Sequence, residues 1–225
     1  MINHIPSKEF MDIAIEEAIV SRQFNEHPVG AVIVRGSEII SKSGNRTHRD
    51  MNPTHHAEVV VIGVATKLLG KKNLSDCILY TTHEPCPMCT AASIYARIGG
   101  IVFGTSIDDV VRFVAENPQA RWRSIDVSSS TIISRGDSSL FVIEGFMKRQ
   151  CASLFSLLLD GMSTAPLTPV DVVTIPPGAV SGGSPIGADT SGKLNHEADF
   201  LLHRGPRLSE ERLLMGWEQR PTSPS

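Results

Sequence analysis

The chain has 225 residues, of which 41% are hydrophobic, and its formal net charge is −3. This size suits one globular domain with a sizeable core, with or without an appendage. Four cysteines are too few for a disulfide scaffold, no segment approaches the roughly 18 to 20 apolar residues of a membrane span, and the slight acidity disfavours a broad nucleic-acid-coating surface. The first ten residues lack the pattern of a secretory signal, so we expect a cytoplasmic protein without membrane association.

Hydrophobic periodicity predicts the first elements in chain order. A helix is expected over residues 7–24 with Ser7 as its N-cap, and two strands over 29–35 and 38–44 flank a Gly-Ser turn typical of a hairpin. A second helix is expected over 53–70, capped by Thr54 and ended by Gly70, and a buried strand follows over 77–82.

The second half of this region continues the alternation of helices and strands. We expect a helix over 87–98, a strand over 99–104, a helix over 108–116, a strand near 131–135 and a last helix over 144–159. This succession predicts an α/β fold, a three-layer α-β-α sandwich in which a mixed five-stranded sheet carries helices on both faces.

The composition changes after residue 162. Residues 163–192 are rich in Pro, Gly, Ser and Thr and contain no aromatic residue, so they cannot bury enough apolar surface to offset their chain entropy. We therefore predict a domain over 1–162 and, over 163–225, a linker and tail with possible short helices and no assigned function.

Two cysteines, Cys86 and Cys89, lie three residues apart at the start of a predicted helix, where both side chains share one face. The electropositive helix N-terminus favours the thiolate form, which is the form that binds metal. His56 and Glu58 lie at the start of another predicted helix, and the two helix ends could meet at one metal ion. Three protein ligands would leave one position open, as in catalytic zinc sites, with Glu58 placed to move a water proton.

Other interpretations of the cysteines and histidines stay open at this point. A structural zinc site would need a fourth protein ligand, for which His55, His83 and Cys77 are candidates. A redox-active cysteine pair is disfavoured because no thioredoxin-like pattern precedes it. Cys77 and Cys151 lie in apolar segments, so the simpler interpretation makes them buried small hydrophobic residues.

Four segments follow one another along the chain: HPVGAVIVRGSEII, NPTHHAE, LYTTHEPCPMC and SIYARIGGIVFG. Together they resemble the cytidine-deaminase-like zinc deaminase superfamily, in particular its branch with guanine deaminase, tRNA adenosine deaminases and fungal-type cytosine deaminase. The resemblance covers roughly residues 5 to 160 and does not extend to the tail. It implies one Zn²⁺ per subunit held by His56, Cys86 and Cys89, a Glu58 that shuttles protons, and a homodimer or larger homo-oligomer.

The same resemblance implies substrate contacts. The Ala57 backbone N–H is expected to contact the base, Asn45 to bind it, and Val29 to line the pocket. His83 is expected to line the pocket or to support a ligand, and Asp108 to bind a substrate amino group as in guanine-specific relatives. The simpler interpretations make Asn45 a turn residue and Asp108 a charge at a helix N-terminus.

For the function, the resemblance favours hydrolytic deamination of a nucleobase or nucleoside by zinc-bound hydroxide, with release of ammonia. A guanine-type aminopurine is our leading small-molecule substrate. A tRNA adenosine deaminase (A to I) is the alternative, which is not favoured because residues 1–162 hold 16 basic and 17 acidic residues. A non-catalytic zinc-containing binding module is a third possibility, against which Glu58 argues.

Overall fold

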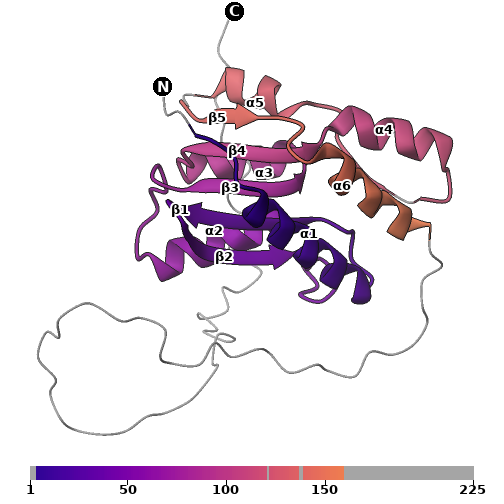
Figure 1. Ribbon diagram of the computed structural model, residues 1–225, viewed down its shortest axis with the longest axis horizontal. Coiled ribbons are helices and arrows are strands. Elements are labelled where there is room, and N and C mark those ends of the chain that lie inside the picture. Colours follow the sequence, from indigo (N-terminus) through magenta and orange to yellow (C-terminus); the bar gives the residue numbers. More distant parts are fainter. Residues whose placement is uncertain (1–3, 121, 137–138, 160–225) are drawn as a thin grey trace, which may run out of the picture. The chain divides into compact units, whose positions relative to one another are not determined.

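Residues 4–120, 122–136 and 139–159 are described by the computed structural model of the chain (Figure 1). The predicted tail, residues 163–225, lies outside these ranges. Across the described ranges, none of the helices is both long enough and apolar enough to span a bilayer.

A mixed sheet of five strands forms the centre of the fold, in the order β2-β1-β3-β4-β5 (Figure 1). β1 pairs antiparallel with β2 and β3, whereas β3, β4 and β5 run parallel. The strands are β1 (Gly30–Arg35), β2 (Glu38–Gly44), β3 (Ile78–His83), β4 (Gly100–Thr105) and β5 (Phe141–Ile143).

Helices cover both faces of the sheet, as the sequence predicts. They are α1 (Lys8–Gln23), α2 (Ala57–Leu68), α3 (Pro87–Tyr95), α4 (Ile107–Glu116), α5 (Ser129–Arg135) and α6 (Lys148–Ser153), with a 3₁₀ turn over Leu154–Leu158. Successive side chains of a strand point to opposite faces. Val32, Tyr80 and Val102 accordingly pack with α1 and α6, while Ile33 and Ile101 pack with α2 in a second core cluster. The predicted three-layer sandwich is confirmed.

Three expectations about local structure were wrong. Residues 131–135 form part of α5 rather than a strand, because the Ser128 hydroxyl caps a helix at the Thr131 N–H. The fifth strand is instead β5, and the predicted last helix is shortened to α6 and the 3₁₀ turn. The N-cap of α2 is His56 and not Thr54, which lies in the preceding turn.

Several residues that the sequence analysis singled out lie together at one edge of the sheet, where β1 begins and β2 and β3 end. Because β1 is antiparallel to both neighbours, its start lies beside the ends of β2 and β3. Val29 precedes β1, Asn45 follows β2 and His83 ends β3, so all three meet at this edge. The backbone of α1 passes so close to β1 here that a Cβ on Gly30 would lie 1.9 Å from a carbonyl oxygen.

Candidate metal centre and active site

A group of three possible metal ligands lies at this edge of the sheet. His56 Nδ1, Cys86 Sγ and Cys89 Sγ are each 3.6 Å from the other two. Tetrahedral zinc with bonds of about 2.3 Å to sulfur and 2.0 Å to nitrogen separates its donor atoms by roughly 3.5 to 3.8 Å, so the three atoms fit zinc. In the described ranges this is the one cluster of His, Cys or acidic residues suited to a metal ion.

The three metal ligands lie at the N-termini of two helices, α2 and α3. His56 is the N-cap of α2, and Cys86 is the N-cap of α3, with Pro87 in the first turn where its missing N–H costs nothing. Cys89 lies one turn into α3 and is fully buried. The positive ends of both helix dipoles therefore point at the two thiols and favour their ionisation.

The two thiols differ in their acidity. Contacts with Cys89 and with His56 lower the pKa of the Cys86 thiol to about 4. The pKa of Cys89 is raised well above its ordinary value, chiefly by the contact with Cys86 and by burial. One of the two sulfur ligands is thus ionised at neutral pH before a metal binds.

None of the candidate fourth ligands joins the cluster. The His55 Nδ1 lies 2.7 Å from an Asp50 carboxylate oxygen, and the His83 Nδ1 lies 3.0 Å from the Thr105 hydroxyl. Cys77 is buried just before the start of β3, at the opposite edge of the sheet, and Cys151 is buried against β4. The donor set is therefore the three-ligand set of a catalytic zinc, which when bound activates water for attack on the substrate.

Glu58 lies beside this cluster in the first turn of α2. Its side chain is 3% exposed, and Oε2 lies 3.5 Å from the Cys89 sulfur, while Oε1 accepts a long 3.4 Å contact from the Thr81 hydroxyl. Burial is the largest cause that raises the pKa of the Glu58 carboxyl. A carboxyl with a raised pKa can take up a proton and release it again, which suits a proton carrier.

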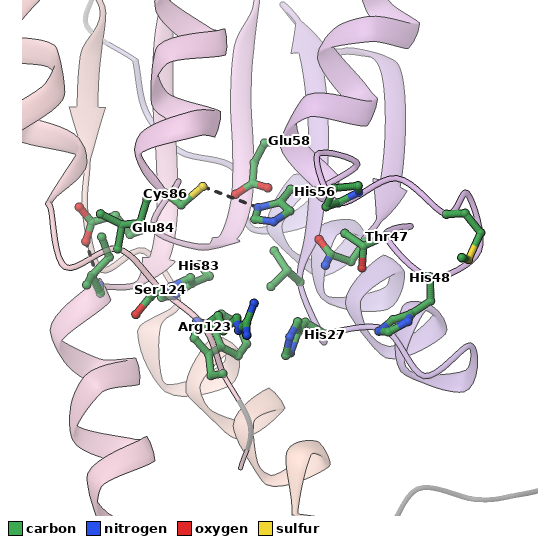
Figure 2. A pocket seen from close by; sticks show the side chains of 17 residues that line it. His27, Thr47, His48, His56, Glu58, His83, Glu84, Cys86, Arg123 and Ser124 are labelled. Carbon is green, nitrogen blue, oxygen red and sulfur yellow. Dashed lines mark hydrogen bonds between the residues drawn. The ribbon is translucent and has the colours of Figure 1, made fainter. Parts of the chain in front are cut away.

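A cavity of about 510 Å³ is lined by two of the ligands, His56 and Cys86, and by Glu58 (Figure 2). Its volume lies in the usual range for small-molecule sites. Three of the predicted substrate-binding residues line it: Val29, Asn45 and His83. The structure thus brings Val29, Asn45 and His83 together with the metal ligands, although Val29 and Cys89 are 60 positions apart in the sequence.

Asn45 and Ala57 contact each other rather than facing the cavity together. The Ala57 backbone N–H donates a 3.1 Å hydrogen bond to Asn45 Oδ1. Ala57 is fully buried and is not among the residues that line the cavity, and its predicted contact with the substrate stays a prediction. No described residue accepts from the Asn45 amide nitrogen, which leaves that donor to the cavity.

His83 closes the inner wall as a neutral imidazole. The Thr105 hydroxyl donates to the Thr82 carbonyl oxygen at 3.2 Å, so it accepts from His83 Nδ1–H and leaves Nε2 as an acceptor. Burial lowers the pKa of His83 to about 4. The side chain therefore offers a bare nitrogen lone pair at neutral pH.

Asp108 does not take part in the cavity. It is exposed in the first turn of α4 and is not among the lining residues. Its neighbour Asp109 completes a capping box with Ser106 and pairs with Lys148 at 2.9 Å. The two aspartates of this turn therefore lie as negative charges at the helix N-terminus, as in the simpler interpretation.

Sequence reasoning missed several cavity residues. Trp122, Arg123 and Ser124 come from the connection between α4 and α5, and His27 and Glu84 also line the cavity. The available signal was the RWR triplet over residues 121–123, an aromatic residue between two arginines in an otherwise polar stretch. No periodicity marks such a segment, so its place over the cavity is set by tertiary contacts.

Residues 5–105 match a family profile described as the cytidine and deoxycytidylate deaminase zinc-binding region. The chain is 39% identical over 113 residues to the tRNA-specific adenosine deaminase of Agrobacterium fabrum, covering 48% of this chain and 74% of that protein. It is 45% identical over 82 residues to the guanine deaminase of Bacillus subtilis, covering 36% of this chain and 53% of that protein.

A solved structure shares the fold. A chain from work on A-to-I editing by tRNA:A34 deaminases at the wobble position of transfer RNA superposes with a TM-score of 0.56 at 31% identity, covering 66% of this chain and 99% of the other. Sequence match, fold and three-ligand geometry agree with one another. The chain therefore belongs to the cytidine and deoxycytidylate deaminase zinc-binding family and is a zinc-dependent deaminase.

Proposed function

We propose that this protein is a tRNA adenosine deaminase, which converts adenosine to inosine within an RNA anticodon loop. The observation that carries the proposal is the extent of the match to proteins named for that activity: 74% of the Agrobacterium fabrum sequence and 99% of the solved tRNA:A34 deaminase chain. This ranking reverses the guanine preference expected from the sequence, whose supporting match covers only 53% of its relative.

The chemistry of the cavity supports an adenine over a guanine. Guanine presents two donors, its N1–H and its 2-amino group, and a site for it needs a free acceptor such as a carboxylate. Among the described lining residues the carboxylates are Glu58 and Glu84. Glu58 is the proton carrier, and both Glu84 oxygens already accept hydrogen bonds, from the Ile107 N–H and from Ser129. Asp108 lies outside the cavity, so no carboxylate among the described lining residues is left for guanine.

The remaining polar groups of the cavity match the hydrogen-bonding groups of adenine. The Asn45 amide nitrogen is a donor for a ring nitrogen, and His83 Nε2 is an acceptor for the exocyclic amino group. Water adds to C6 of the base, and Glu58 carries the first water proton to N1, where it stays. Glu58 then carries the proton of the new C6 hydroxyl to the departing amino group. The C6–N bond breaks, and the products are inosine and ammonia.

Arg123 and His48, which line the cavity, support an RNA substrate in spite of the nearly neutral domain. His48 and Arg123 line the cavity, and the nearby Asp50 carboxylate is paired with Arg46 and His55. The Arg49 guanidinium lies 4.2 Å from the Phe24 ring centroid in the same loop region. Basic side chains near the cavity mouth are placed to contact a phosphate backbone.

The decisive experiment compares substrates directly. Zinc-loaded protein is incubated with an anticodon stem-loop carrying adenosine at the wobble position, the same stem-loop carrying guanosine, free adenosine, adenine and guanine. We expect inosine in the adenosine stem-loop and no xanthine from guanine, with Glu58→Gln as the inactive control. Xanthine formation without inosine in RNA would replace this proposal by guanine deamination. A homodimer, measured by sedimentation, is a separate expectation.

A further inference from the structure

Residues 122–125, which we call the strap, form one continuous part of the cavity wall. Trp122, Arg123, Ser124 and Ile125 all line the cavity, and they lie between α4 and α5. The family profile ends at residue 105, so the strap lies outside the region that carries the shared zinc chemistry. A wall outside that region is free to differ between members and thus to select the substrate.

The strap belongs to the segment that runs from the start of α4 to the start of α5, and the buried Glu84 carboxylate binds both ends of this segment. Glu84 is 5% exposed, and its Oε2 accepts from the Ile107 N–H at 2.9 Å where α4 begins. Its Oε1 accepts from the Ser129 N–H at 2.7 Å and hydroxyl at 2.8 Å where α5 begins. Glu84 stands two residues before Cys86, so the strap is held at a set position relative to the metal ligands.

Trp122 presents an aromatic surface in the cavity. Its ring centroid lies 4.7 Å from His27, 5.3 Å from His83 and 6.2 Å from Phe155, with interplanar angles of 53°, 83° and 71°. None of these neighbours stacks in parallel with the indole. The contacts hold the ring in place without forming the face-to-face arrangement that a planar base would make.

The strap also carries hydrogen-bond donors without partners in the described part of the chain. Neither the Trp122 indole N–H nor the Arg123 guanidinium bonds to another described residue. Other lining groups are engaged: Thr47 donates to Glu26, and His83 is bonded to Thr105. In Figure 2, Arg123 and His27 lie on the side of the cavity away from Glu58, where the rest of a nucleotide would emerge.

We propose that the strap is the substrate-selecting wall of the site, in which the target base stacks on Trp122 and Arg123 binds a phosphate of the same nucleotide strand. Aromatic residues stack on bases, and the planar guanidinium forms paired hydrogen bonds with phosphate oxygens. The ligand class is therefore a purine nucleotide within an RNA strand. The phosphate contact rests on the proposed tRNA function, whereas base stacking applies to a free nucleoside as well.

Trp122 is tested by binding of purine riboside, which has no 6-amino group and so is not deaminated. It is used as the free nucleoside and at the wobble position of the anticodon stem-loop, with zinc content and thermal melting checked for each variant. We expect Trp122→Ala to raise the Kd of both ligands roughly ten- to hundredfold, and Trp122→Phe to stay within about threefold of wild type. Unchanged binding by Trp122→Ala, or binding of neither ligand by wild type, overturns the proposal.

Arg123 is tested by the difference between the two ligands. Arg123→Gln should raise the Kd of the stem-loop about tenfold at low salt and lower the slope of log Kd against log salt by about 0.7, while the free nucleoside binds as before. Arg112→Gln removes an exposed arginine of α4 that does not line the cavity and should change neither value. An equal loss for both ligands, or none for the stem-loop, refutes the phosphate contact.

The two proposals fail in different ways. Nucleoside binding that depends on Trp122, without any binding of the stem-loop, would refute the tRNA function and the phosphate contact but keep the stacking wall. Stem-loop deamination that is unaffected by Trp122→Ala and Arg123→Gln would keep the function and refute the strap.

Discussion

Glu26 is a buried carboxylate that holds the loop between β2 and α2, and its truncation should loosen one wall of the active site. The side chain is 1% exposed. Its Oε1 accepts from the backbone N–H groups of His48 at 2.8 Å and Arg49 at 3.0 Å, and its Oε2 accepts from the Thr47 hydroxyl at 2.8 Å. Two of these partners, Thr47 and His48, line the cavity, so Glu26 positions cavity residues without touching the substrate.

The expected loss of stability follows from these three contacts. A hydrogen bond to a charged group contributes about 1.5 to 3 kcal/mol net, and the contacts are only partly buried, so water can replace part of what is lost. We expect Glu26→Ala to lower the free energy of unfolding by about 2 to 4 kcal/mol. Glu26→Gln keeps Oε1 for both N–H groups, and its amide can donate to the Thr47 hydroxyl, so its cost should be near 1 kcal/mol.

The assay is chemical denaturation at equal zinc saturation, combined with turnover of the preferred substrate. Glu26→Ala should lose most activity because the part of the cavity wall formed by Thr47 and His48 is no longer held, and Glu26→Gln should retain most of it. A cost below about 1 kcal/mol for alanine, or equal costs for alanine and glutamine, would refute the idea that this carboxylate clamps the loop.

Four further outcomes are expected. Glu58→Gln should keep its zinc, measured by atomic absorption, but lose at least about a hundredfold in turnover; near-normal activity would remove Glu58 from the mechanism. Cys86→Ala should lose zinc and melt at a lower temperature than wild type, and a chelator should lower the melting temperature of wild type only. Gly30→Ala should cost about 3 kcal/mol or more because its Cβ would meet the backbone of α1 at 1.9 Å, while Gly63→Ala, with open space around its Cβ in α2, should gain up to about 1 kcal/mol. The pKa of His83 is lowered to about 4 by burial, so its neutral form adds stability that is complete above pH 6.5 and declines as pH falls towards 4. In urea titrations, His83→Gln should reduce the loss of unfolding free energy between pH 6.5 and pH 4 by about 3 kcal/mol. An unchanged pH profile would contradict the conclusion that His83 is neutral in the folded protein.

The metal centre could be predicted from residues close together in the sequence. Cys86 and Cys89 share a helix face by their spacing, and Pro87 marks the helix start, so the half-site is encoded locally. The alternation of helical and strand segments likewise predicted a sheet with helices on both faces. Short-range periodicity and capping signals are written in neighbouring residues, and these features therefore need no knowledge of the tertiary fold.

The substrate side of the site could not be derived in this way. The expected contact of the Ala57 N–H with the base stays a prediction, since that N–H bonds to the Asn45 side chain here, whereas Asp108 faces solvent instead of the cavity. Both outcomes depend on the direction of a single side chain, which spacing alone does not determine. The helix at residues 129–135 was missed although its signal is local, since the Ser128 cap outweighs the β-propensity of the residues that follow.

By itself, the sequence determined the class of chemistry: three metal ligands and an acid at two helix starts, with the α/β succession that brings those starts together. Only the tertiary structure decided the shape of the cavity. Glu84 binds residues 23 and 45 positions away, and Glu26 binds a loop more than 20 positions away. Contacts over such separations leave no periodic signal, because they arise from which chain segments the sheet places side by side. The strap over the zinc site is the product of those contacts.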